Sequence, residues 1–188
     1  RPDGAILFSD ILIIPYGLGQ SLRFEEGVGP VLEPVENSSD LSRLSPDGSW
    51  SQIEATYETV SRVSQDLPED VALIGFAGAP WTVATYMVEG RSSKDFAKTK
   101  QWAFSDPKGF SALIDMLVEA TIRHLGSQIE AGASIVKLFD SWAGVLAPDQ
   151  FETWVIQPIR QITDRLKQEY PQIPIIGFPK GAGVQYQA

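Results

Sequence analysis

Asp10 is the residue of this sequence whose chemistry first needs an explanation. It lies in the stretch AILFSDILIIP, residues 5–15, where almost every other side chain is apolar. An ionised carboxylate is costly to bury unless hydrogen-bond donors converge on it. Two interpretations follow. Either Asp10 accepts backbone N–H bonds from the turn after a strand, or it is an acceptor held for a cation or for the N–H groups of a ligand.

Three further side chains could take part in chemistry. Tyr86, in WTVATYMVEG, is either a core aromatic residue whose hydroxyl finds a partner or a ligand contact. Ser141, which closes ASIVKLFDS, is either a cap or turn residue or a ligand contact. His124 is the single histidine, and its place on a long predicted helix favours a structural role. With one histidine and no cysteine, neither a His/Cys metal site nor a Ser–His triad can be assembled at the strand ends.

Positive charge gathers in one short run, which consists of Arg91, Lys94, Lys98 and Lys100. The first interpretation is a solvated helix face, and the alternative is steering of an anionic substrate. The stretch KGAG, residues 180–183, could bind an anion through its backbone amides, although two glycines are weak support for such a site.

Four apolar segments predict strands, and amphipathic helices are predicted between them. The strand segments are residues 4–15, 71–78, 133–141 and 173–183, and the helices fall near residues 50–66, 80–90, 108–131 and 147–171. This alternation is typical of an α/β protein with a parallel sheet. An open doubly wound sheet and a closed (β/α)8 barrel both fit, and in either case the carboxyl ends of the strands share one edge. A barrel usually needs about 250 residues, so only about four βα units would be present.

Composition narrows the class of protein. The chain has 188 residues, of which 43% are hydrophobic, and a net charge of −9, which disfavours nucleic acid and anionic membranes as partners. The lack of cysteine excludes disulfides within these residues and is compatible with a cytoplasmic protein. No apolar run reaches the ~20 residues that cross a bilayer. We expect a single domain over residues 1–188, and the start at Arg1 suggests an internal fragment.

The sequence resembles the uroporphyrinogen decarboxylase family along essentially its whole length. GFAGAPWTVATYMVEG, residues 75–90, is similar to the internal signature of that family, and ILFSDILIIP and KLFDSWAG are similar to family segments in the same order. SSKDFAKTK and FPKGAG extend the resemblance. The resemblance implies a (β/α)8 TIM barrel, a homodimer, and a decarboxylase that uses neither metal nor organic cofactor.

The activity implied is conversion of the four acetate side chains of uroporphyrinogen III to methyl groups, giving coproporphyrinogen III in porphyrin and heme biosynthesis. The positions that match the family's substrate-contacting residues are Asp10, Tyr86 and Ser141, with Phe139 lining the cleft. Asp10 would be the catalytic residue, because it would accept pyrrole N–H bonds and stabilise the positive charge that develops on the ring.

Two departures keep other functions open. The family's N-terminal Arg-Gln-Ala-Gly-Arg motif and its C-terminal segment with a substrate-contacting histidine have no counterpart in this sequence, so we expect the chain alone to be an incomplete, inactive barrel. One alternative is a zinc- or corrinoid-dependent methyltransferase of the same superfamily, against which the lack of cysteine argues. The other is a non-catalytic remnant that binds a tetrapyrrole without converting it.

Overall fold

One parallel sheet organises the chain. The structure is a computed structural model that describes residues 2–27, 29–45 and 49–187. The strands are parallel and lie in the order β1-β4-β5-β6, with bounds β1 (Gly4–Ile6), β4 (Ala72–Gly78), β5 (Ile135–Asp140) and β6 (Ile175–Pro179). A separate antiparallel hairpin consists of β2 (Leu22–Glu25) and β3 (Gly29–Leu32). The predicted α/β class with a parallel sheet is therefore confirmed.

Helices connect the strands. They are α1 (Ile13–Gly17), α2 (Glu54–Asp66), α3 (Pro80–Glu89), α4 (Ala97–Ser105), α5 (Pro107–Glu130), α6 (Pro148–Phe151) and α7 (Gln157–Glu169). A π turn over Glu152–Ile156 separates α6 from α7. It lies just before Pro158, whose missing N–H leaves a gap in helical hydrogen bonding. Within the described residues, no helix is both long and apolar enough to cross a membrane.

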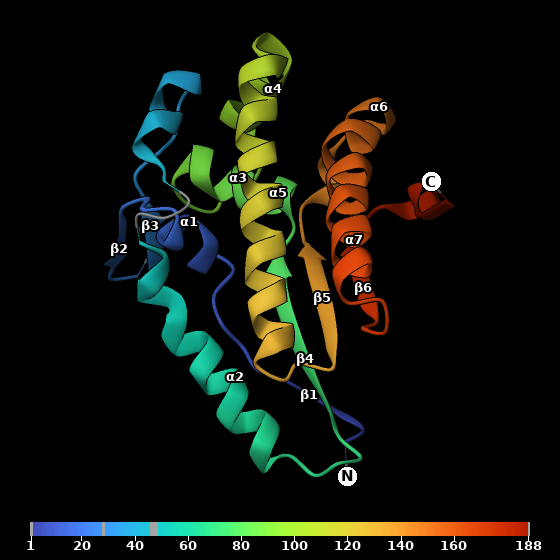
Figure 1. Cartoon of the computed structure of the whole chain (residues 1–188). Coiled ribbons are helices and arrows are strands. Elements are labelled where there is room, and N and C mark those ends of the chain that lie inside the picture. Colours follow the sequence, from blue (N-terminus) through green and yellow to red (C-terminus); the bar gives the residue numbers. More distant parts are fainter. Residues whose placement is uncertain (1, 28, 46–48, 188) are drawn as a thin grey trace.

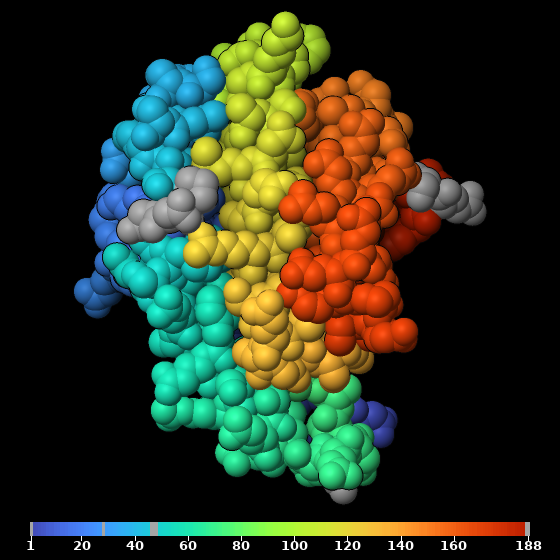
Figure 2. Space-filling model, in the orientation of Figure 1, coloured from blue at the N-terminus to red at the C-terminus, as the bar shows by residue number. Residues whose placement is uncertain are grey.

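The two faces of the sheet differ. Figure 1 shows α5 and α7 over one face, and in the space-filling view the surfaces of α2, α5 and α7 meet side by side (Figure 2). On β5, Val136 and Leu138 are fully buried in the main core with α5. The alternating residues Lys137 and Phe139 lie on the opposite face, which these helices do not cover.

The first strand is shorter than the sequence predicts, and it is not covered on both faces. β1 ends at Ile6, which is exposed together with Phe8, and α1 begins at Ile13. A turn at Asp10 leads from this segment into α1, since its Oδ1 accepts the N–H of Leu12 at 2.9 Å and its carbonyl accepts the N–H of Ile13 at 3.0 Å. An apolar run alone cannot distinguish a strand from a strand followed by a short buried helix.

Because β1 ends early, β4 needs another hydrogen-bond partner. The side-chain amide of Gln128 on α5 provides it: Oε1 accepts the N–H of Phe76 and Nε2 donates to the carbonyl of Phe76, both at 3.0 Å. Gly75 leaves room for this amide, since a Cβ at that position would lie 2.8 Å from Gln128 Oε1. Gln128 therefore fixes the backbone of Phe76 where β1 has left the sheet.

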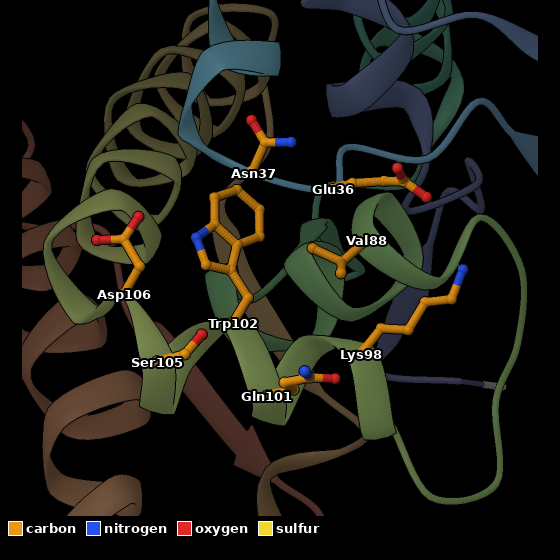
Figure 3. A pocket seen from close by; sticks show the side chains of 8 residues that line it. All are labelled: Glu36, Asn37, Val88, Lys98, Gln101, Trp102, Ser105 and Asp106. Atoms are coloured by element: carbon orange, nitrogen blue, oxygen red, sulfur yellow. The ribbon is translucent and has the colours of Figure 1, made fainter.

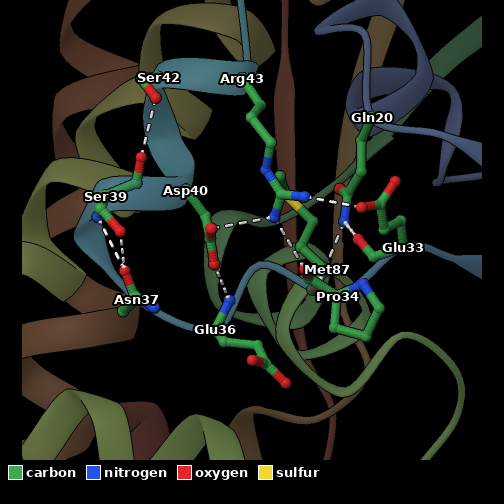
Figure 4. A network of polar contacts seen from close by, with 10 residues as sticks. All are labelled: Gln20, Glu33, Pro34, Glu36, Asn37, Ser39, Asp40, Ser42, Arg43 and Met87. Atoms are coloured by element: carbon green, nitrogen blue, oxygen red, sulfur yellow. Dashed lines mark hydrogen bonds and ion pairs between the residues drawn. The ribbon is translucent and has the colours of Figure 1, made fainter.

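Helix α3 is anchored at its carboxyl end by the hairpin and the residues on either side of it. Gly90 ends the helix with a left-handed φ of 78°, and its carbonyl accepts the N–H of Leu32 at 2.7 Å. The carbonyl of Met87 accepts the N–H of Val35 and the side-chain amide of Gln20. Figure 4 shows this region together with the ion pairs that hold the same segment, between Arg43 and Glu33 at 2.7 Å and between Arg43 and Asp40 at 3.2 Å.

Candidate active site

The candidate residues come from separate strand ends. Asp10 lies in the turn after β1, Tyr86 lies on α3 after β4, and Ser141 directly follows β5. Phe139 is the second-last residue of β5. The parallel sheet places the carboxyl ends of its strands at one edge, as a site of this kind requires.

Four phenylalanines form a row across the uncovered face of the sheet, and we call them the phenylalanine row. Neighbouring ring centroids are 5.9 Å apart for Phe8 and Phe76, 5.5 Å for Phe76 and Phe139, and 5.9 Å for Phe139 and Phe178. Phe8 is 81% exposed and Phe178 is 39% exposed, whereas Phe76 between Phe8 and Phe139 is buried, at 4%. The exposed members of the row, Phe8 and Phe178, together with the half-buried Phe139, give this face apolar surface that a ligand ring could contact.

Sequence reasoning found only Phe139 of this row. A signal was present, because each phenylalanine occurs two residues before a polar or glycine residue at a strand end: Phe8 before Asp10, Phe76 before Gly78, Phe139 before Ser141 and Phe178 before Lys180. In the parallel sheet Phe139 pairs with Phe178, and Phe76 pairs with Lys137, two residues before Phe139, so these three phenylalanines share one face.

Lys137 places a positive charge next to two rings of the phenylalanine row. Its Nζ lies 4.5 Å from the ring centroid of Phe139 and 4.8 Å from that of Phe178. A cation over an aromatic face is attracted by the ring's electrons, so Lys137 restrains both rings. Sequence reasoning missed this residue, since a single lysine in an apolar strand resembles an ordinary exposed position.

Asp10 combines the two roles that the sequence left open. Its Oδ1 is the acceptor for Leu12 N–H that forms the turn, which is the structural role. Its side chain is nevertheless exposed, and within the described residues its other oxygen has no hydrogen-bond partner. The carboxylate is therefore not buried among apolar side chains, and one oxygen remains accessible to a ligand.

The turn after β5 holds Ser141 tightly. The carbonyl of Phe139 accepts the N–H of Ala79, and the carbonyl of Asp140 accepts the N–H of Lys180. On the other side of Ser141, the N–H of Trp142 donates to Thr82 Oγ1 at 3.0 Å. The Ser141 hydroxyl has no partner in the described part of the chain, so a ligand could use it.

Asp140 is a buried acid that sequence reasoning did not single out. It is fully buried, and its Oδ1 accepts the Thr82 hydroxyl at 2.6 Å. Burial raises the pKa of Asp140 to about 7, while hydrogen bonds from the side chain and backbone of Thr82 oppose the rise. Its signal in the sequence was an acid at the last position of a strand whose alternate residues face the core.

Tyr86 extends from α3, one helical turn after Thr82. It is half-buried and packs against the main core, as the structural interpretation requires. Its hydroxyl has no hydrogen-bond partner among the described residues, which leaves the functional interpretation open as well.

The basic run lies mostly at the surface. Arg91, Lys94 and Lys98 are exposed, as a solvated face predicts. Lys98 lines a pocket of about 380 Å³ between α4 and the segment before the 3-10 helix Ser38–Arg43, shown in Figure 3. Glu36 and Asp106 line the same pocket, so its carboxylates outnumber its single ammonium group. This balance does not favour an anionic ligand there.

His124 lies behind β4, in the core. Its Nδ1 is 3.0 Å from the hydroxyl of Tyr57 on α2, and burial lowers the pKa of His124 to about 4. The histidine is therefore neutral in the folded state over most of the pH range. Its position is consistent with the structural role expected from the sequence.

We expect the contribution of His124 to the free energy of unfolding to decrease as pH falls from about 6.5 to about 4, because the unfolded chain binds a proton at His124 that the folded chain does not. His124→Gln should reduce this dependence. Asp140 acts in the opposite direction, since its raised pKa makes the folded state hold the extra proton. The informative quantity is therefore the difference between wild type and variant in urea denaturation at several pH values. A difference that does not change with pH would contradict the prediction.

The fold and the placement of the candidate site define a class: an α/β chain whose parallel strands form part of a (β/α)8 barrel. A solved methyltransferase from Methanosarcina mazei has this fold, with a TM-score of 0.70, 18% sequence identity, and coverage of 86% of this chain and 48% of that chain. At this identity the likeness concerns the fold alone.

Sequence comparison defines the family. The family model for Uroporphyrinogen decarboxylase (URO-D) matches residues 1–187. The chain is 50% identical over 185 residues to "Uroporphyrinogen decarboxylase" of Rhodospirillum rubrum, covering 98% of this chain and 53% of that relative. It is 55% identical over 181 residues to the protein of the same name from Rhizorhabdus wittichii, covering 96% and 52%. The chain belongs to the uroporphyrinogen decarboxylase family, and it spans about half the length of the curated relatives it matches.

Proposed function

We propose that the complete protein containing this chain removes the carboxyl groups of the four acetate side chains of uroporphyrinogen III and produces coproporphyrinogen III. The family match over residues 1–187 is the observation that carries this proposal. The phenylalanine row supports it, because a largely apolar macrocycle needs an extended apolar wall.

Asp10 is the catalytic residue of this proposal. A porphyrinogen presents pyrrole N–H donors at its centre, and a carboxylate with one accessible oxygen can accept them. When a pyrrole carbon is protonated, the ring accepts the electron pair of the breaking bond, and the carboxylate leaves as CO2. Protonation of the resulting exocyclic methylene and loss of the added ring proton then give the methyl group and restore the pyrrole. The Asp10 carboxylate stabilises the positive charge that develops on the ring, and this interaction strengthens when substrate displaces water.

Tyr86 and Ser141 bind carboxylates at the edge of the ring. Both hydroxyls lack partners in the described chain, and a hydroxyl that donates to a carboxylate makes a charge-assisted hydrogen bond. Phe139 lines the cleft beside Ser141. The ring serves as the electron acceptor, so the proposal assigns no metal or organic cofactor to the reaction.

The proposal extends to the architecture of the complete protein. We infer a single barrel domain, a homodimer and a cytoplasmic location, and the family resemblance supports the first two. Sedimentation of the purified complete protein tests the homodimer, and a monomer at micromolar concentration would contradict it.

The reaction is tested by incubating the complete protein with uroporphyrinogen III under anaerobic conditions and separating the oxidised products by chromatography. We expect coproporphyrin to accumulate. Binding without loss of carboxyl groups would contradict decarboxylation and favour the tetrapyrrole-binding alternative. The likeness to the methyltransferase concerns the fold only, and no contact among the described residues favours methyl transfer.

A further inference from the structure

Both the backbone N–H and the carbonyl of Trp142 are held by side chains of α3. Its N–H donates to Thr82 Oγ1 at 3.0 Å, and its carbonyl accepts the indole N–H of Trp81 at 3.1 Å. Ser141 immediately precedes Trp142. The direction of the Ser141 side chain therefore depends on where the first turn of α3 lies.

The Thr82 hydroxyl can accept the N–H of Trp142 only in one orientation. It has a single proton, which it donates to Asp140 Oδ1 at 2.6 Å, and this leaves a lone pair for the N–H of Trp142. Thr82 and Asp140 are both fully buried, so water cannot replace either partner. The acid orients the hydroxyl, and the hydroxyl fixes the turn.

The same helix carries the second candidate hydroxyl. Tyr86 follows Thr82 by four residues, so the two side chains leave adjacent parts of one helix face. The carboxyl end of α3 is fixed separately by the hydrogen bonds of Gly90 to the last residue of the hairpin and of Met87 to the segment after it. A change at Thr82 would therefore act at the junction with Ser141 rather than by releasing the whole helix.

We propose that Thr82 and Asp140 form a positioning pair that holds the Ser141 hydroxyl at a set distance from the Tyr86 hydroxyl, so that both reach carboxylates of one bound substrate. This inference rests on the proposed function and adds to it two residues that need not touch substrate. Carboxylates arranged around a rigid ring have fixed separations, so a displaced turn weakens binding of the intermediates as well as of the substrate.

The test compares Thr82→Val with Thr82→Ser in the complete protein. Valine has nearly the shape of threonine without the hydroxyl, whereas serine keeps the hydroxyl. Thr82→Val should lower kcat/KM by about 10- to 100-fold and increase the release of partly decarboxylated products. Thr82→Ser should restore most of the activity and the normal product distribution.

Thr85→Val is the matched control. Thr85 is equally buried on the same helix, but its hydroxyl donates to the carbonyl of Thr82 at 2.6 Å and does not contact the turn. If Thr82→Val and Thr85→Val have the same kinetics at a temperature where both are folded, or if serine does not restore activity, the positioning role is wrong.

Asp140→Asn completes a double-mutant cycle with Thr82→Val. If the two residues act as a unit, the double variant should be as active as the less active of the two single variants. If the losses of the two single variants multiply in the double variant, the residues act independently and the inference is contradicted. Wild-type protein without turnover would refute the proposed function itself. By contrast, an active wild type together with an equally active Thr82→Val variant would refute the positioning role alone.

Discussion

Asp10→Asn is expected to lower turnover of uroporphyrinogen III by at least about 100-fold in the complete protein and to leave the fold intact. The substitution is expected to affect turnover and not folding, because the two carboxylate oxygens of Asp10 have different roles. The amide oxygen of asparagine can still accept the N–H of Leu12, which forms the turn before α1. The variant loses the negative charge, and the charge is what would stabilise a cationic ring.

Two further variants test this separation. Asp10→Ala removes the turn acceptor as well as the charge, so it should lower both turnover and the free energy of unfolding. Asp3→Asn makes the same charge change at the opposite end of β1, where it should alter neither. Chromatography of the products and urea denaturation measure the two quantities. Near-normal formation of coproporphyrinogen by Asp10→Asn would contradict the catalytic role.

The parts of the fold that local pattern determines could be predicted from the sequence. β4 and β5 carry apolar side chains on both alternating faces and end at glycine or polar residues, and both strands were found. Helix α3 begins with Pro80 and ends before Gly90, which are standard signals for the start and end of a helix. The expected α/β class follows from these elements, whereas the choice of a partial barrel over an open doubly wound sheet came from the family resemblance.

The features that depend on contacts between distant residues could not be predicted. The turn into α1 depends on the hydrogen bond that the N–H of Leu12 donates to Asp10, and an apolar run gives no sign of that bond. The Thr82–Asp140 pair joins residues 58 positions apart. Asp10, Tyr86 and Ser141 were candidates from their types and positions, while Phe139 and the role of each residue came from the family resemblance. These roles remain predictions, and the structure adds the other three members of the phenylalanine row.

Gly144→Ala is expected to destabilise the complete protein by about 1–3 kcal/mol and to lower turnover by about tenfold. Gly144 lies in the loop after β5, and Gly181 lies in the loop after β6. A Cβ at position 144 would lie 2.5 Å from the carbonyl oxygen of Gly181 and 2.7 Å from its carbonyl carbon. These are backbone atoms, so no side chain can rotate away, and one of the loops must move.

The displacement would reach the site through two hydrogen bonds. Gly144 N–H donates to the carbonyl of Lys180 at 3.1 Å, and Lys180 N–H donates to the carbonyl of Asp140 at 3.0 Å, next to Ser141. Gly126→Ala is the matched control, because a Cβ there would meet Tyr170 at an ordinary 3.4 Å inside α5, where alanine favours the helix. Urea denaturation and turnover should separate the two variants. Equal stability and activity would mean that the two loops adjust independently of the site, and that Ser141 does not depend on the close approach of the strand-end loops.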